Sequence, residues 1–316
     1  MAAAMGSDYL IAAVVVGGLI GTLARLTMLK IDYRQYPSYP QGLTIHLALG
    51  AVAAFIGSVA APAIAEREFA AATFLALAAT QFREVRNMER QTLLSLETTE
   101  LVPRGAGYIE GIARVFEARN YLAMLTALLS STTIVVAGAM GAGIWTAVAL
   151  GALAGVGTTM VLRRGVGGPH VGDIADVEIV QIEFDGPLLT VAGVIIMNIG
   201  LSDAKERYER EGVGVLITPK DRDARETLAN IGQRQAIAHD AATLVGVTKE
   251  IDEPFFTPLV RRDGVKGHVV MAIIPAEKNH DALLEAVRRV PILESAVRKP
   301  SASPAGRIAR QSRKHS

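Results

Sequence analysis

The chain has 316 residues, of which 50% are hydrophobic, with a mean hydropathy of +0.32 and a formal net charge of +1. It contains no cysteine, which excludes disulfides, thiolate nucleophiles and cysteine-based zinc or iron–sulfur sites. Nearly all long apolar runs lie before residue 163. We therefore predict a multi-span α-helical membrane domain over residues 1–164, a cytosolic α/β domain with a four- to five-stranded sheet over residues 165–298, and a disordered basic tail over residues 299–316.

Five apolar segments of the first half are candidate transmembrane helices. Four of them have the roughly 20 residues that a bilayer requires, and these are residues 9–29, 43–63, 121–140 and 144–162. The remaining segment, residues 69–82, has only fourteen residues. That length alone favours a surface or re-entrant helix.

The basic residues between these segments favour five spans with the N-terminus outside. In that arrangement only Arg67 lies in an external connection, whereas four spans would leave Lys30 and Arg34 outside. The connections that face the cytosol contain Lys30, Arg34, Arg83, Arg86, Arg90, Arg104, Arg114, Arg119, Arg163 and Arg164. Because cytoplasmic loops carry an excess of Lys and Arg, we predict that the C-terminal domain is cytosolic.

Two polar residues and several small ones interrupt the apolar segments. Arg25 and His46 each lie about one turn from the cytoplasmic end of a span, where Arg25 could extend to the lipid headgroups or face an inward polar site that includes His46. Gly17 and Gly21 form a G-x-x-x-G pattern, and Ala147, Gly151 and Gly155 recur at four-residue spacing. Such faces allow close helix packing, in a bundle or in a homo-oligomer.

Residues 83–120 are expected to form an amphipathic cytoplasmic segment that runs without a breaker into the span at 121–140. At helical spacing, Glu110, Arg114, Glu117 and Tyr121 share one face. The opposite face carries Ile109, Ile112, Ala113 and Phe116. The polar face is either simply solvated or contacts protein. In the second case Glu110, Arg114 and Glu117 face either a polar cluster with Arg25 and His46 or the cytosolic domain folded back against the membrane. Gly111 favours contact, since glycine costs about 1 kcal/mol inside a helix unless close approach requires it.

The hexapeptide Tyr108-Ile109-Glu110-Gly111-Ile112-Ala113 carries a family resemblance. It matches the signature of the YIEGIA family of membrane proteins of endospore-forming bacteria, and the flanking residues 83–97 and 116–131 are also similar to that family. The resemblance extends over about residues 8–298. It implies a role in spore formation or germination, in the cell or forespore membrane, and it implies no defined reaction.

The second half shows the pattern of an α/β domain. Residues 165–170 are expected to be a hinge, and apolar runs at 177–184, 194–198, 213–217 and 269–274 predict strands. Helices are expected from Ser202, from Pro219 onward and over 278–289. The last eighteen residues are turn-rich and basic, with no acidic residue, and could approach an anionic lipid surface.

Candidate sites in this half are weak. His170, Asp173 and Asp176 have metal-capable side chains at three-residue spacing, a pattern common in polar linkers, so we predict no metal or other cofactor. The Phe184-Asp185-Gly186 stretch lacks the hydroxyl residue of an aspartic-protease motif and is explained as well by a hairpin turn. His239 and Asp240 are interpreted as a surface pair. The sequence shows no P-loop, H-E-x-x-H or G-x-S-x-G motif.

Three functions follow from these observations. The first is a non-enzymatic membrane scaffold or regulator that docks a cytosolic protein partner. The second is a membrane-bound hydrolase, most plausibly a protease acting on a spore protein through Asp173, Asp176 and Asp185, since such chemistry needs two carboxylates in one site. A transporter is disfavoured because the ionisable residues lie near the ends of the spans. The lipid bilayer is the other expected partner, and no specific nucleic acid is predicted.

Overall fold

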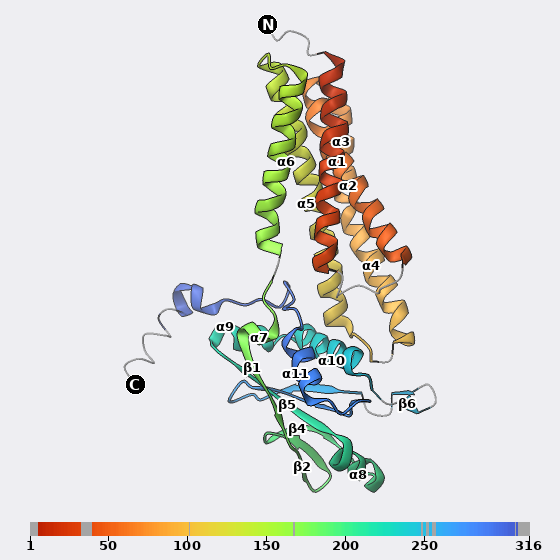
Figure 1. Cartoon of the computed structure of the whole chain (residues 1–316), viewed down its shortest axis with the longest axis vertical. Helices are drawn as coiled ribbons and strands as arrows, with labels where there is room; N and C mark the ends of the chain where they lie inside the picture. Colours follow the sequence, from red (N-terminus) through yellow and green to blue (C-terminus); the bar gives the residue numbers. More distant parts are fainter. Residues whose placement is uncertain are drawn as a thin grey trace. The chain divides into compact units, whose positions relative to one another are not determined.

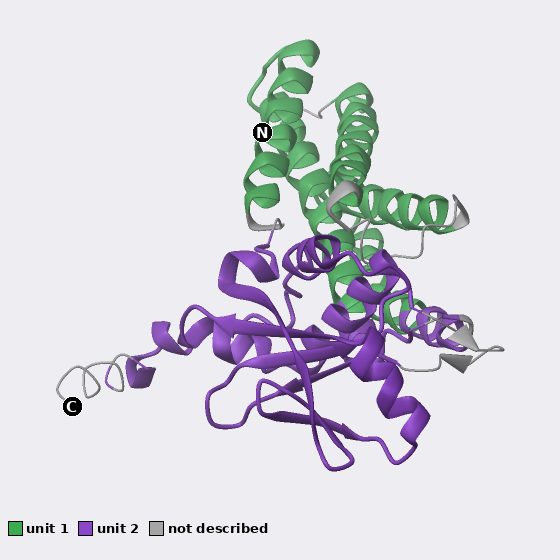
Figure 2. Cartoon of the chain, turned by 60° about the horizontal axis from the view of Figure 1, so that its bottom comes forward, with its two compact units in different colours: residues 1–89, 112–167 green, residues 90–111, 168–316 purple. Residues whose placement is uncertain are grey.

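The computed structural model describes residues 6–32, 40–100, 102–166, 168–247, 249–250, 253–254, 257–306 and 308. The chain forms two compact units (Figure 2), residues 1–89 with 112–167 and residues 90–111 with 168–316. It therefore passes from one unit to the other three times. The predicted boundary after residue 164 lies close to the last of these passages, and the structure adds residues 90–111 to the second unit.

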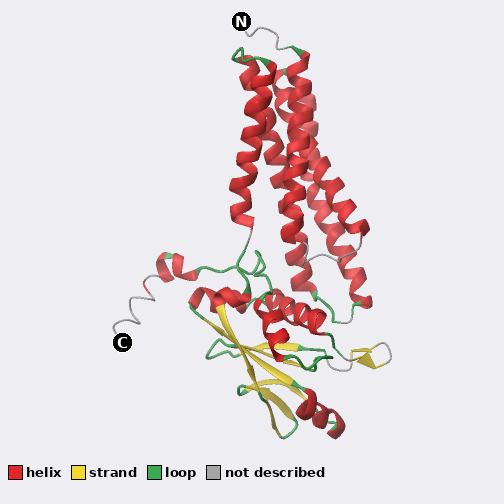
Figure 3. Cartoon of the chain, viewed as in Figure 1, coloured by secondary structure: helices red, strands yellow, loops and turns green. Residues whose placement is uncertain are grey.

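The first unit is helical (Figures 1 and 3). Its helices, two of which begin or end in the second unit, are α1 Ser7–Asp32, α2 Pro40–Ala65, α3 Phe69–Thr80, α4 Phe82–Leu96, α5 Ala106–Ala139 and α6 Ile144–Val166. In the described part of the chain, four helices are long and apolar enough to cross a membrane, namely Ser7–Leu29, Gly42–Ala65, Ala106–Ala139 and Ile144–Arg164. These helices identify a multi-pass membrane protein.

By itself, α3 is too short to be one of the full spans, so the predicted crossing at 69–82 is not made by this helix alone. This helix has 12 residues, which extend over about 18 Å, whereas the hydrocarbon core of a bilayer is about 30 Å thick. The polar residues from Gln81 onward end the apolar run. Gln81 nevertheless keeps a helical backbone conformation, with φ −65° and ψ −17°, so α3 and α4 continue in nearly the same direction.

Contacts inside the first unit show which helix ends lie together. The Tyr9 hydroxyl near the start of α1 donates to the carbonyl of Ala142 in the α5–α6 turn, at 2.8 Å, and Ala61 near the end of α2 packs in the same cluster. Toward the other end of the bundle, Glu89 of α4 contacts His46 of α2. The α3–α4 path therefore returns along α2, and α6 ends at the opposite end of the bundle from the start of α1.

Small residues let the bundle helices approach at backbone distance. A β-carbon built on Gly21 would lie 2.7 Å from the carbonyl oxygen of Ala123, and one on Gly57 would lie 2.1 Å from that of Met124. Gly155 likewise packs against Ile20. The predicted small-residue packing is confirmed within the bundle, while a homo-oligomer stays a prediction.

The second unit is a mixed α/β fold with two main sheets. The larger has the order β1-β5-β9-β8, and its strands are β1 Ala175–Val180, β5 Val213–Pro219, β8 Leu259–Arg262 and β9 Val269–Ile273. The smaller consists of β2 Ile182–Asp185, β3 Leu188–Val191 and β4 Val194–Asn198. A short pair is formed by β6 Lys249–Glu250 and β7 Glu253–Pro254. Neighbouring strands are antiparallel throughout.

The helices of this unit alternate with the strands along the chain (Figure 1). They are α7 Val171–Ile174, α8 Ser202–Glu211, α9 Arg222–Leu228, α10 Ile231–Val245 and α11 His280–Arg288, with 3-10 turns η1 Glu97–Thr99 and η2 Pro300–Ala302. Leu189, Ile196, Tyr208 and Val270 belong to a core that the two sheets share with α8. All five residues of β9 are buried, which explains its continuous apolar run.

The strand predictions are confirmed at 194–198, 213–217 and 269–274, with small differences at the ends. The predicted strand 177–184 instead divides at Gln181 between the two sheets. At the expected hinge, residues 165 and 166 complete α6, and residue 167 lies outside the described residues. The expected disordered tail is ordered at its start, where the Ser301 N–H donates to Asp223 at 2.9 Å; residues 309–316 lie outside the described residues.

Candidate functional site

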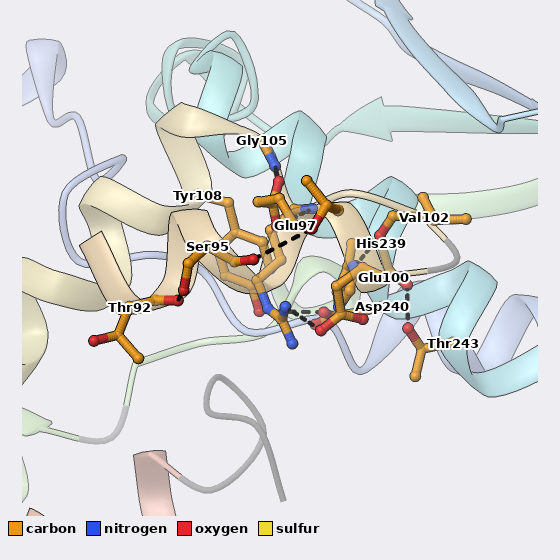
Figure 4. Close-up of polar contacts among 12 residues, drawn as sticks. Thr92, Ser95, Glu97, Glu100, Val102, Gly105, Tyr108, His239, Asp240 and Thr243 are labelled. Carbon is orange, nitrogen blue, oxygen red and sulfur yellow. Dashed lines mark hydrogen bonds and ion pairs between the residues drawn. The ribbon is translucent and has the colours of Figure 1, made fainter. Parts of the chain in front are cut away.

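The start of α5 is held by side chains of the second unit. Gly105 has a φ of +80° and breaks the chain just before the helix. The Glu97 carboxylate accepts the N–H groups of Arg104 at 3.0 Å and Gly105 at 2.8 Å, and Figure 4 shows it beside Gly105. Because the first N–H groups of a helix have no partner within it, and a negative charge is favoured there, Glu97 stabilises this helix start.

Gln235 of α10 supplies a second acceptor at the same helix start. Its side-chain oxygen accepts the N–H groups of Gly107 at 3.0 Å and Tyr108 at 3.3 Å. The backbone of Gly107 also packs directly on Gly232, where a β-carbon would lie 2.5 Å from the Gly107 carbonyl oxygen. The first turn of α5 is thus fixed on α10 by hydrogen bonds and by glycine-to-glycine contact.

Tyr108 is buried against two polar residues of α10. Its hydroxyl donates to Asp240 at 3.1 Å, and its ring meets the ring of His239 edge-on with centroids 6.0 Å apart. Nδ1 of His239 lies 2.6 Å from the carbonyl oxygen of Val102, so Nδ1 carries the proton in this bond. Burial, the largest cause, lowers the pKa of His239, which keeps the ring neutral near pH 7.

The interpretation of His239 and Asp240 as a surface pair is therefore wrong. His239 is buried, because the segment from Val102 to Tyr108 covers this face of α10 (Figure 4). The covering segment is distant in sequence from α10. Its presence could not be read from the residues around 239.

A second polar cluster lies in the helical unit. Arg25 is fully buried, with its guanidinium carbon 5.7 Å from the centroid of the Phe116 ring, a cation–π distance. His46 meets the same ring edge-on at 4.4 Å. Arg25 is therefore covered by protein and does not extend to a lipid headgroup, and the inward polar site that includes His46 is the arrangement observed.

Glu89 belongs to this cluster and was missed by the sequence analysis. Its carboxylate lies 3.6 Å from Nε2 of His46. Burial raises the pKa of Glu89 to about 7, although nearby Arg25 acts in the opposite direction. The Glu89 carboxylate can therefore take up or release a proton near neutral pH. The missed signal was spacing, since Glu89 lies four and seven residues from buried Leu93 and Phe82 on one helical face.

Comparison with known proteins identifies the relatives of this chain. The sequence model of the family described as YIEGIA protein matches residues 13–303. The chain belongs to the YIEGIA family. An uncharacterized protein of Bacillus subtilis (strain 168), YphB, is 43% identical over 295 residues, which cover 93% of this chain and 96% of the relative. No solved structure matches the chain.

The YIEGIA signature is shared between the two units. Tyr108 and Gly111 lie in the second, where a β-carbon on Gly111 would be 3.1 Å from the Ser295 hydroxyl and 3.3 Å from a methyl group of Leu293. Ile112 and Ala113 lie in the first and are fully buried.

The two predicted faces of α5 differ in burial. Ile109 and Phe116 are fully buried, as expected for the apolar face. On the other face Glu110 is half-buried and Arg114 is exposed. Glu117 accepts a hydrogen bond from Arg86 at 3.2 Å. Arg86 is thus a partner of Glu117 that the sequence analysis did not name.

Of the three carboxylates proposed for hydrolysis, Asp173 and Asp176 both lie near Lys220, and Asp185 lies in the other sheet. Asp173 lies in α7, where it accepts the His170 N–H at 2.7 Å in a capping box, and Asp176 lies in β1, 3.9 Å from Lys220. Asp185 ends β2 in the other sheet, beside the expected hairpin turn. All three are exposed. Within the described ranges, no group of three or more His, Asp or Glu residues is placed to hold a metal ion.

Proposed function

We propose that this protein is a membrane scaffold or regulator that presents its α/β unit to a protein partner, in spore formation or germination. Membership of the YIEGIA family and a relative in Bacillus subtilis support the biological setting. Asp173, Asp176 and Asp185 are all exposed and Asp185 lies in the other sheet, which favours the scaffold over the protease alternative.

One observation carries the proposal. The first turn of α5 is bound within the α/β unit by Glu97, Gln235 and Asp240, and the same helix continues without interruption to Ala139. These side chains hold the start of a membrane helix within the α/β unit, which supports a role in presenting that unit. The carboxylate and amide oxygens of this network accept backbone N–H groups and a tyrosine hydroxyl.

We further propose that the N-terminus is external and the α/β unit cytosolic. The exit of α6 at the bundle end opposite the start of α1 supports this arrangement, as does the distribution of basic residues. In the cysteine-free chain, Ser7→Cys should react with an impermeant thiol reagent in intact cells, and Asp185→Cys should react only after permeabilisation. Labelling of Asp185→Cys in intact cells would rule the orientation out.

The docking proposal is tested by loosening the anchor without touching an exposed surface. Gln235→Ala removes the acceptor of two helix N–H groups, a loss of about 1–3 kcal/mol. Expressed at native level in a spore-forming host that lacks its own copy, it should lower the yield of heat-resistant spores or the germination rate. Gln91→Ala, which removes the amide of an exposed glutamine in α4, is the matched control. Equal behaviour of both variants at equal protein abundance would contradict the proposal.

A further inference from the structure

A basic pocket lies in the α/β unit, where α9 begins beside the turn between β8 and β9. Its volume is about 430 Å³, within the range of about 300–1,000 Å³ that small-molecule sites occupy. Four of its seven lining residues are basic or histidine and two are acidic. The lining consists of Pro219, Asp221, Arg222, Arg225, Glu226, Lys266 and His268.

The two acidic side chains already have partners. Asp221 caps α9 by accepting the N–H of Ala224 at 2.7 Å. Glu226 lies 3.9 Å from the guanidinium of Arg262. By contrast, the side chains of Arg222 and Lys266 make no hydrogen bond or ion pair with any residue that the structure describes. The Asp263 carboxylate interacts electrostatically with Lys266 and His268, so the free hydrogen-bonding capacity of the pocket lies on Arg222 and Lys266.

Arg225 is held in place before any ligand arrives. Its Nη2 donates to the carbonyl of Val265 at 2.9 Å. Gly267 has a φ of +76°, and a β-carbon there would lie 2.3 Å from Nε of Arg225, so a glycine is required for the turn to close over the guanidinium. Asp263 fixes the same turn by accepting the N–H groups of Val265 at 2.7 Å and Lys266 at 3.0 Å.

Further arginines continue the positive region beyond the pocket. Burial first, and then the neighbouring Arg261 and Arg262, lower the pKa of Arg234. Arg262 is also the partner of Glu226 in the pocket wall. Crowded like charges raise the local potential, which attracts anions.

We propose that this pocket binds the phosphate group of a small molecule. A guanidinium offers a planar pair of donors that matches a phosphate, and a lysine adds a compact positive charge. Arg222 and Lys266 can supply these groups, whereas Nε of Arg225 is buried and its Nη2 is held by Val265. The pocket is concave and of suitable size, and it is lined by Arg222, Arg225 and Lys266. The two lining carboxylates, Asp221 and Glu226, already interact with a helix N–H group and with Arg262. The ligand chemistry is shared by soluble phosphate esters and phospholipid headgroups.

The test is calorimetric titration of the full chain, in phosphatidylcholine nanodiscs, with inorganic pyrophosphate at about 150 mM salt, where long-range charge effects are screened. We expect saturable binding that Arg222→Gln with Lys266→Gln weakens about tenfold or more. The matched control is Lys205→Gln with Arg210→Gln, which removes two positive charges from α8 and should change the affinity less than about twofold. Both pairs are on exposed or half-exposed side chains, and Lys266→Glu alone is a second pocket variant.

A second set of nanodiscs containing phosphatidylglycerol separates the two sources of phosphate. Weaker pyrophosphate binding by the wild type, but not by the pocket variant, assigns the pocket to a lipid headgroup. Unchanged binding assigns it to a soluble ester. The proposal is overturned if pyrophosphate shows no saturable binding, if the control pair weakens binding as much as the pocket pair, or if a glutamate-rich peptide binds the pocket more tightly than pyrophosphate.

Discussion

The two units each place a histidine, a carboxylate and an aromatic ring together. The two clusters differ in whether a side chain changes its protonation near neutral pH. In the α/β unit, His239 donates to a backbone carbonyl and Asp240 accepts from Tyr108, so each polar group has a fixed partner. In the helical unit, His46 and Glu89 lie 3.6 Å apart. Glu89 titrates near neutral pH. The same residue types therefore form fixed hydrogen bonds in the α/β unit and include a carboxylate that changes protonation near neutral pH in the helical unit.

The two sites should respond to pH with opposite signs. The pKa of Glu89 is about 7 in the folded state and 4.5 as a reference, so the folded state holds the extra proton between these values. Its contribution to stability is full below about pH 4.5 and is lost as the pH rises to 7. The pKa of His239 is lowered from 6.5, so the unfolded state holds the extra proton below that value, and acid weakens this site.

The largest expected effect is that of Glu89→Gln. A rise of about 2.5 pKa units corresponds to on the order of 3 kcal/mol, so the wild type should lose stability between pH 5 and 7 relative to the variant. Thermal unfolding in detergent across this range measures the difference. The pH dependence of stability that the variant still shows below pH 6.5 should be the loss of stability in acid that we attribute to His239.

Infrared titration supplies a direct check on the same prediction. The wild type should show a protonated carboxyl band with a midpoint near pH 7 that Glu89→Gln removes. If that band instead titrates near 4.5, the pair in the bundle is an ordinary ion pair, and the contrast between the two sites disappears.

A smaller effect is expected for Tyr108→Phe. Loss of the bond to Asp240 should cost about 1 kcal/mol, and peptides that contain residues 106–111 should exchange their amide hydrogens faster. Tyr121→Phe is the control, because it removes a hydroxyl from the same helix that donates to the Ala79 carbonyl at 3.2 Å. Faster exchange at 106–111 in both variants would mean that the hydroxyl of Tyr108 has no special part in anchoring the helix start.

Local patterns predicted much of the fold. Length and apolarity located the four long helices, and the buried strand β9 followed from its continuous apolar run. The apolar face through Ile109, Ile112 and Phe116 followed from helical periodicity, because each of these signals resides in neighbouring residues.

Long-range contacts account for what was missed. Glu89 was not singled out, since its contact with His46 of α2 joins residues far apart in the sequence. His239 looked exposed because the covering segment lies far away in the sequence. The predicted strand 177–184 divides at Gln181 because its two parts pair with strands that the local pattern could not specify.

The chain passes three times between its units, which determines how many proteolytic cuts would be needed to release the α/β unit from the membrane. A protease that cut once, near residue 167, would detach residues 168–316 from α6 but would leave residues 90–111 joined to membrane helices at both ends. The cut piece would stay bound to that segment through Gln235, His239 and Asp240. Release of the intact unit requires two more cuts, each within a helix. A single cleavage therefore does not release this unit intact, because its residues 90–111 remain covalently joined to the membrane helices.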